Sequence, residues 1–111
     1  MQVRVRHILQ KHTGSRNPIV RATGKAVTRS KDEAIANVQQ FKAQIQSEQD
    51  FASIAQQFSE CGSSAQGGDL GFFGPGQMQA PFEEASFALA PGQISELVDT
   101  DSGIHIIMRL E

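Results

Sequence analysis

Residues 2–10 read Gln2-Val3-Arg4-Val5-Arg6-His7-Ile8-Leu9-Gln10. Apolar side chains alternate in this range with charged or polar ones, namely Val3, Val5 and Leu9 with Arg4, Arg6 and Gln10. A period of two is typical of a strand that buries one face. We therefore expect a half-buried strand here, with His7 on the same face as Val3 and Val5.

The last residues of the chain carry a second strand pattern. Asp101-Ser102-Gly103 is typical of a turn, and apolar residues follow it at Ile104, Ile106, Met108 and Leu110. We expect a hairpin whose first strand covers about 94–99. His105 lies on the second strand, so sheet pairing could bring it close to His7 in a shared polar site. The simpler interpretation is that each ring only completes a hydrogen bond in the core.

Three helices are predicted between these strands. Ser30 and Glu33 form a capping-box signature, and apolar residues at helical spacing continue it over about 31–47. Asp50 is the expected N-cap of a second, short helix with one apolar face formed by Phe51, Ile54, Ala55 and Phe58. Pro81 suits the first turn of a third helix, which Pro91-Gly92 ends.

A glycine-rich stretch over 62–76 separates the second and third helices, and Leu70, Phe72 and Phe73 predict a short strand inside it. The order of elements is strand, helices, strand, helix and hairpin. This order predicts one α+β domain over residues 1–111, with a small, mostly antiparallel four-stranded sheet surrounded by three to four helices.

The basic residues are unevenly distributed. Eight of the ten Lys and Arg lie within the first 31 residues, and the first acid is Asp32. Residues 11–29 show little periodicity and are expected to form a long exposed loop that holds most of these bases. A loop of this length is typical of a functional or a mobile segment. An anion-binding surface is one interpretation, and a solvated loop is the other. No motif supports nucleic-acid binding.

Composition limits the cellular setting. Cys61 is the only cysteine, so no internal disulfide is possible and a reducing compartment is expected. The sequence before His7 lacks the apolar region of a signal peptide, and no apolar run approaches the roughly 20 residues that span a membrane. We expect an intracellular monomer, cytoplasmic or nuclear, without a membrane segment or cofactor.

Cys61 opens the glycine-rich stretch and admits several interpretations. It could be a small buried apolar residue, or a nucleophile with a histidine as base, although no cysteine-enzyme signature surrounds it. Together with His7 and His105 it could in principle bind zinc. The spacing matches no zinc pattern, so we predict no metal site.

Five segments, in order, resemble the parvulin family of prolyl isomerases. They are Val5-Arg6-His7-Ile8-Leu9-Gln10-Lys11-His12, the helix-forming 51–58 leading to Ser59-Glu60-Cys61, Gly68-Asp69-Leu70-Gly71-Phe72-Phe73, Gln77-Met78 with 81–89, and Asp101-Ser102-Gly103-Ile104-His105-Ile106-Ile107. The resemblance covers essentially the whole chain. Cys61 and the basic loop are most similar to the phospho-specific, Pin-type branch, and because the sequence has no Trp we expect no WW module.

The resemblance implies peptidyl-prolyl cis–trans isomerisation at phosphorylated Ser/Thr–Pro segments, in a parvulin/FKBP-like fold, without a covalent step. The polar group that it implies around the twisting amide is His7, Cys61, Ser102 and His105. The implied proline pocket is Leu70, Met78 and Phe82. Lys11 and Arg16 match two positions that bind the substrate phosphate.

Asn17 occupies the third phosphate-binding position, where this branch normally has Arg, and Arg21 is a candidate to compensate for it. Two alternatives therefore stay open. One is a phospho-Ser/Thr–Pro binding module with little turnover, and the other is a general parvulin without a phosphate preference.

Overall fold

The strand predicted at residues 2–10 is β1, Val3–Gln10, in a computed structural model that describes residues 1–20 and 23–111. β1 pairs antiparallel with β4, Asp69–Phe73, on one side and with β6, Gly103–Arg109, on the other. β5, Val98–Thr100, pairs with β6. Within the described residues these four strands form one sheet in the order β4-β1-β6-β5. The predicted α+β class with an antiparallel sheet is confirmed.

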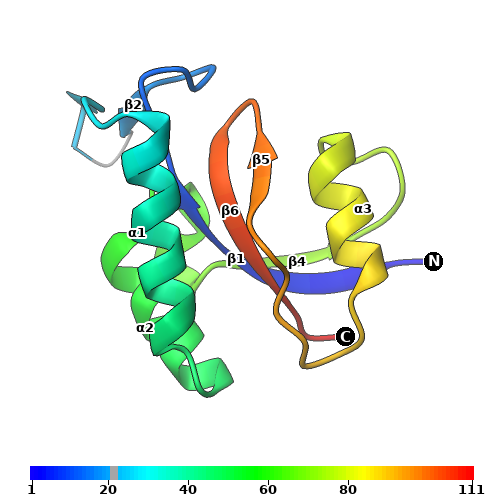
Figure 1. Ribbon diagram of the computed structural model, residues 1–111. Helices are drawn as coiled ribbons and strands as arrows, with labels where there is room; N and C mark the ends of the chain where they lie inside the picture. Colours follow the sequence, from blue (N-terminus) through cyan, green and yellow to red (C-terminus); the bar gives the residue numbers. More distant parts are fainter. Residues whose placement is uncertain (21–22) are drawn as a thin grey trace.

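Helices cover both faces of this sheet (Figure 1). α1, Lys31–Gln44, and α2, Glu48–Phe58, pack on one face, where Val38 and Phe51 meet Ile8 and Ile106 in the larger apolar core. α3, Ala80–Ala88, packs on the other face, where Phe82 meets Val5, Phe73 and Ile107. Strand alternation therefore directs odd-numbered residues of β1, including His7, toward α3.

The sequence patterns predict the presence of α1 and α2 correctly, but they predict the first and last residues of these helices less well. Ser30 and Glu33 form the capping box of α1 as expected. The helix stops at Gln44, however, and α2 begins at Glu48 with Ser47 as its N-cap, so the prediction of Asp50 as the cap is wrong. The Asp50 backbone N–H donates to Ser47 Oγ, which places Asp50 at the third helical position rather than at the cap.

Apart from residues 21 and 22, which the structure does not describe, the segment 11–29 is more ordered than a structureless loop. It contains a small antiparallel pair, β2 (Ile19–Val20) with β3 (Lys25–Ala26), and Val27 is buried. Its two ends are joined because the Thr13 N–H donates to the Arg29 carbonyl at 3.0 Å. The proposed compensation by Arg21 lies outside the described residues.

The closing hairpin is shorter on its first side than predicted. β5 begins at Val98, whereas residues 94–97 contribute only an isolated bridge between Ile94 and Met108. α3 has Pro81 in its first turn and ends at Ala88, before the Pro91-Gly92 turn. Both features agree with the helix predicted from these prolines.

Gly68 allows β4 to approach β1 at His7. The His7 N–H donates to the Gly68 carbonyl at 3.0 Å. A Cβ atom on Gly68 would lie 2.2 Å from the His7 carbonyl oxygen, and its φ of +83° is in the region that favours glycine. The pairing register shifts at this point, between Arg4 and Arg6.

Across residues 1–20 and 23–111, none of the helices combines the length and apolar character that crossing a bilayer requires.

Candidate active site

Two buried histidines form the base of the candidate site. His105 lies opposite Leu9 in the register between β1 and β6, so His7 and His105 are diagonal neighbours on the same face of the sheet. Their rings stack with centroids 5.2 Å apart, and the two Nδ1 atoms are 3.0 Å apart. The predicted meeting of residues from the two ends of the chain is present in the structure.

Thr100 extends this pair into a chain of hydrogen bonds. Its Oγ1 lies 2.7 Å from His105 Nε2 and accepts the Ser102 backbone N–H at 3.1 Å. Because an Nδ1–Nδ1 hydrogen bond needs one protonated and one bare nitrogen, the two neutral rings have complementary tautomers. His7 Nε2, at the end of the chain, is buried and has no hydrogen-bond partner among the described residues.

Burial keeps both rings uncharged. Desolvation lowers the pKa of His7 to about 4. The pKa of His105 falls to about 3, first because of burial and second because of the neighbouring His7. Near neutral pH the pair therefore carries no charge, although each ring keeps one donor and one acceptor nitrogen.

Phe82 forms the apolar side of this base. Its ring meets His7 edge-on at 5.4 Å between centroids and His105 at 5.2 Å. Leu70 and Met78 are half-buried and pack on the same apolar cluster. The three residues predicted for the proline pocket thus lie together around the α3 side of the histidines.

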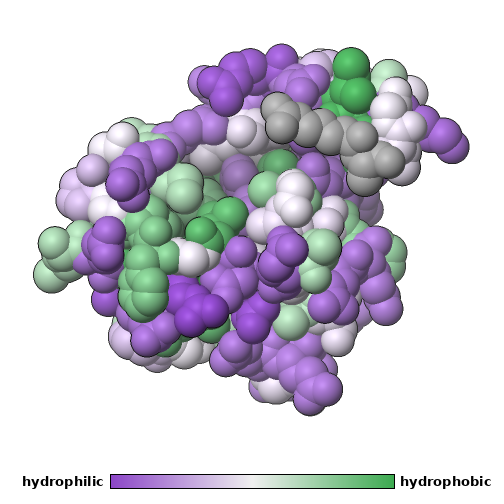
Figure 2. All heavy atoms as spheres, turned by 180° about the vertical axis from the view of Figure 1, so that it is seen from behind, coloured by the Kyte–Doolittle hydropathy of each residue, from purple (hydrophilic) through white to green (hydrophobic). Residues whose placement is uncertain are grey.

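A cavity of about 430 Å³ lies at the end of β1. Its lining includes four of the predicted site residues, which are Lys11, Arg16, Cys61 and Ser102. Figure 2 shows a hollow in the surface, with hydrophobic atoms in its floor and hydrophilic atoms around it. The buried pair His7 and His105 and the apolar trio Leu70, Met78 and Phe82 do not line this cavity.

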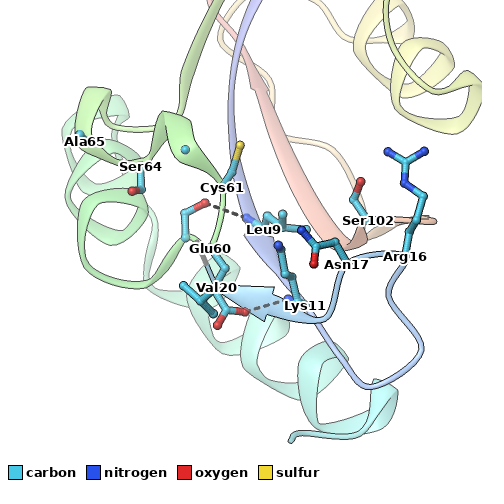
Figure 3. Close-up of a pocket in the computed structure, with 12 residues that line it drawn as sticks. Leu9, Lys11, Arg16, Asn17, Val20, Glu60, Cys61, Ser64, Ala65 and Ser102 are labelled. Atoms are coloured by element: carbon cyan, nitrogen blue, oxygen red, sulfur yellow. Dashed lines mark hydrogen bonds between the residues drawn. The ribbon is translucent and has the colours of Figure 1, made fainter. Parts of the chain in front are cut away.

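The segment after α2 brings Cys61 to this cavity by taking the place of a neighbouring strand. The Leu9 N–H donates to Ser59 Oγ at 3.0 Å, and the Leu9 carbonyl accepts the Glu60 N–H at 2.9 Å. Cys61 follows directly, is half-buried, and precedes the 3₁₀ helix η1, Gly62–Gln66. Figure 3 shows its sulfur among the cavity residues, near Leu9.

Lys11 and Arg16 approach the cavity by different means. Lys11 is buried, and its Nζ donates to the Ile19 carbonyl at 2.7 Å. Arg16 is exposed, and its backbone N–H donates to the Asp101 carbonyl at 2.7 Å. This backbone bond fixes Arg16 beside Ser102 in the turn before β6, as Figure 3 shows.

Ion pairs separate the structural bases from the candidate ligand-binding bases. Arg4 pairs with Asp69, which lowers the pKa of that carboxyl group mainly through the hydrogen bond. The other paired bases of the N-terminal segment are Arg6 with Glu48, Arg29 with Glu60 and Lys31 with Asp99. In the part of the chain that the structure describes, the side-chain nitrogens of Lys11 and Arg16 have no carboxylate within 4 Å and remain available for an anion.

Two residues of the site were missed by the sequence analysis. Thr100 had a detectable signal, because it is a polar residue at a buried position two residues after Val98 on the same strand. Gln79 had none, since its contacts are distant in sequence. Its Nε2 donates to Ser102 Oγ at 2.9 Å, and its Oε1 accepts the Asp101 N–H at 3.1 Å.

Comparison with known proteins agrees with this arrangement. Residues 7–111 match the family described as "Rotamase: PPIC-type PPIASE domain". A Theileria annulata protein named peptidyl-prolyl cis-trans isomerase NIMA-interacting 1 is 50% identical over 113 residues, which cover 98% of this chain and 80% of the relative. Peptidyl-prolyl cis-trans isomerase Pin1 of Arabidopsis thaliana is 46% identical, with 97% of this chain and 94% of the relative covered.

Solved structures lead to the same family. Peptidyl-prolyl isomerase ESS1 from Candida albicans superposes with a TM-score of 0.91 at 38% identity, over 99% of this chain and 63% of that one. The solution structure of TbPIN1 gives 0.88 at 47% identity, over 99% and 97% of the two chains. The chain is therefore a peptidyl-prolyl cis–trans isomerase of the parvulin family, and it is similar over its whole length to that family's Pin1-like members.

Proposed function

We propose that residues 1–111 act as a single isomerase domain on Ser–Pro and Thr–Pro bonds whose Ser or Thr is phosphorylated. The observation that carries this proposal is the cavity in which Lys11 and Arg16 lie with Cys61 and Ser102. Cations without carboxylate partners thus line the same cavity as Cys61 and Ser102, two members of the candidate polar group of the isomerase site. The partners of the enzyme would be proteins that contain such phosphorylated segments.

The reaction requires rotation about a bond with partial double-bond character, whose barrier is roughly 18–20 kcal/mol. In the twisted state the prolyl nitrogen becomes more basic and the carbonyl less polarised. We assign the proline ring to Leu70, Met78 and Phe82, where apolar contacts exclude water. Only contacts that are stronger in the twisted state than in the planar states lower the barrier.

The polar group needs no charge to perform this task. The Nδ1–Nδ1 hydrogen bond fixes one ring of His7 and His105 as donor and the other as acceptor while both rings stay neutral. Such a pair can orient the site without a full charge that would favour one planar form of the amide. Cys61 and Ser102 would then adjust the environment of the carbonyl, and no bond to either is required.

Phosphate binding would hold the residue before proline while the other side of the bond rotates. Arg16 offers a planar fork for phosphate oxygens, and Lys11 offers a compact charge. Charge-assisted hydrogen bonds of this kind are roughly twice as strong as neutral ones. Lys11 Nζ has three donors, so one bond to the Ile19 carbonyl leaves two for a phosphate.

A parvulin without phosphate preference is the second candidate function. Asn17 favours it, because this exposed residue lines the cavity and contributes no charge. A binding module with little turnover is less well supported, since the family is one of isomerases and the full polar group is retained.

Exchange spectroscopy by NMR on matched Ser–Pro and phospho-Ser–Pro peptides tests the proposal. We expect much faster isomerisation of the phosphorylated peptide, and loss of that advantage in the double variant Lys11→Ala with Arg16→Ala. Equal rates for both peptides in the unmodified protein would favour the second candidate. Exchange no faster than in buffer would contradict isomerase activity altogether.

A further inference from the structure

Arg29 belongs to the basic segment but does not line the cavity. Its Nη1 donates to the Lys11 carbonyl at 2.9 Å and also to Glu60 Oε1. The side chain thus connects the far end of the segment 11–29 with both the proposed phosphate-binding lysine and the residue before Cys61.

Glu60 completes the contact from the other side. Its Oε1 also accepts the Lys11 backbone N–H at 2.8 Å, a bond drawn as a dashed line in Figure 3. The backbone N–H and carbonyl of Lys11 are therefore both held by the ion pair of Glu60 and Arg29. This happens just beyond the end of β1, where β4 no longer pairs with it.

The position of Glu60 creates an electrostatic problem for a phosphate ligand. Glu60 lines the cavity together with Lys11 and Arg16, and its side chain is only 12% exposed. A carboxylate there repels an incoming phosphate dianion, and partial burial limits screening of that repulsion by salt. The guanidinium of Arg29, 27% exposed, is bonded directly to the carboxylate and offsets its charge.

We infer that Arg29 and Glu60 form a positioning pair that sets the preference for phosphorylated substrates, with Glu60 fixing the Lys11 backbone and Arg29 neutralising Glu60. The inference rests on the proposed function, because it takes the phosphate to lie at Lys11 and Arg16. Neither residue touches the reacting bond, so their effect acts on substrate discrimination rather than on rotation itself.

The test is a double-mutant cycle measured with matched Ser–Pro and phospho-Ser–Pro peptides. Arg29→Gln leaves an uncompensated carboxylate beside the phosphate site, and we expect kcat/KM for the phosphopeptide to fall about tenfold. That loss should appear mainly in KM, while kcat/KM for the unphosphorylated peptide stays within about twofold.

Glu60→Gln keeps an acceptor for the Lys11 N–H but removes the charge, so the phosphopeptide should be turned over at least as well as by the wild type. The double variant R29Q/E60Q contains no uncompensated carboxylate, and its phosphopeptide kcat/KM should return to within about threefold of the wild type. Arg29→Lys, which retains the charge, should keep most of the preference.

Lys42→Gln is the matched control, because Lys42 also forms an ion pair, with Glu96, away from the cavity. Lys42→Gln should leave kcat/KM unchanged for both the Ser–Pro and the phospho-Ser–Pro peptide. Two results would overturn the inference: an equal loss of kcat/KM for both peptides in R29Q, or no recovery of phosphopeptide kcat/KM in the double variant. Either result would mean that the pair of Arg29 and Glu60 only stabilises the fold. A wild type without phosphate preference would overturn the proposed function and this inference with it, which is a separate result.

Discussion

Thr100 connects the backbone of the hairpin turn to the histidine pair, and its hydroxyl is the residue-scale feature most open to a clean test. Thr100→Val keeps the shape of the side chain but leaves His105 Nε2 and the Ser102 N–H without their partner. We expect the free energy of unfolding to fall by roughly 1–3 kcal/mol. Urea denaturation measures this, and Thr28→Val, at an exposed position, is the control.

The isomerisation rate of the same variant adds a second result. If Thr100 orients the rings of His105 and His7, kcat of the folded Thr100→Val variant should fall, in addition to the lower free energy of unfolding. An unchanged free energy of unfolding in Thr100→Val would show that the hydroxyl is readily replaced, by water for example, and would remove its assigned role.

The histidine pair also makes stability depend on pH. Both rings have a lower pKa in the folded protein, about 4 for His7 and about 3 for His105, than the usual 6.5. The unfolded chain therefore binds protons first as pH falls, so stability is complete above pH 6.5 and declines toward pH 4. At pH 5 the loss is roughly 2 kcal/mol for each ring.

Denaturation at several pH values, combined with NMR titration of the imidazole signals, checks this expectation. The carboxyl group of Asp69 has a lowered pKa and would lose its contribution only below its ordinary value of 3.8, so it does not confuse the range above pH 5. Imidazole signals of His7 or His105 that titrate near pH 6.5 would contradict the assignment.

At the scale of single elements, Gly68 predicts a strong and local effect. Gly68→Ala places a Cβ against the His7 carbonyl oxygen in addition to straining a positive φ, and should destabilise the protein by about 3 kcal/mol or more. Gly76 has nearly the same φ, +84°, but open space around it. Gly76→Ala therefore reports the backbone strain alone, at about 1 kcal/mol.

Thermal unfolding of the two variants separates the contributions. Because the clash in Gly68→Ala acts on the strand that carries His7, its activity should fall as well, whereas that of Gly76→Ala should not. Equal losses of stability would indicate that contact between β4 and β1 matters less than backbone conformation.

Which features the sequence could predict depended on the range of the interactions. Period-two strands and the Ser30 capping box are local signals, and they predicted β1, β6 and the start of α1. The cap of α2 was assigned wrongly because Ser47 and Asp50 are both good cap residues, and only the backbone geometry distinguishes them. The β2–β3 pair was missed because strands of two residues have no periodicity.

The candidate site followed the same division. The residues that the structure gathers at the cavity and the histidine pair were found mainly through the ordered family motifs. Gln79 and the Arg29–Glu60 pair could not be found, because their partners lie 22 to 31 residues away in sequence. The functional roles of all these residues remain predictions.

At the scale of the whole molecule, the basic residues divide into those that form ion pairs and those that are available to bind an anion. Most of the described bases of the N-terminal segment pair with distant acids, and Lys11 and Arg16 stay available at the cavity. We expect KM for a phosphopeptide to rise severalfold between about 0.05 and 0.5 M NaCl, because salt at the higher concentration screens charges beyond a few ångströms. An unphosphorylated peptide in the same titration is the control. Parallel changes in both would argue against charge-guided binding.

The pairing of β1 with β6 at the centre of the sheet affects how the chain can fold during synthesis. These are the first and last strands of the described chain, and they meet in the middle of the sheet, with His7 and His105 98 residues apart in sequence. A chain emerging from the ribosome cannot close its sheet until β6 has left the exit tunnel. Contacts of such long range slow folding, and until β6 has been synthesised the nascent chain has neither the centre of its sheet nor the pair of His7 and His105.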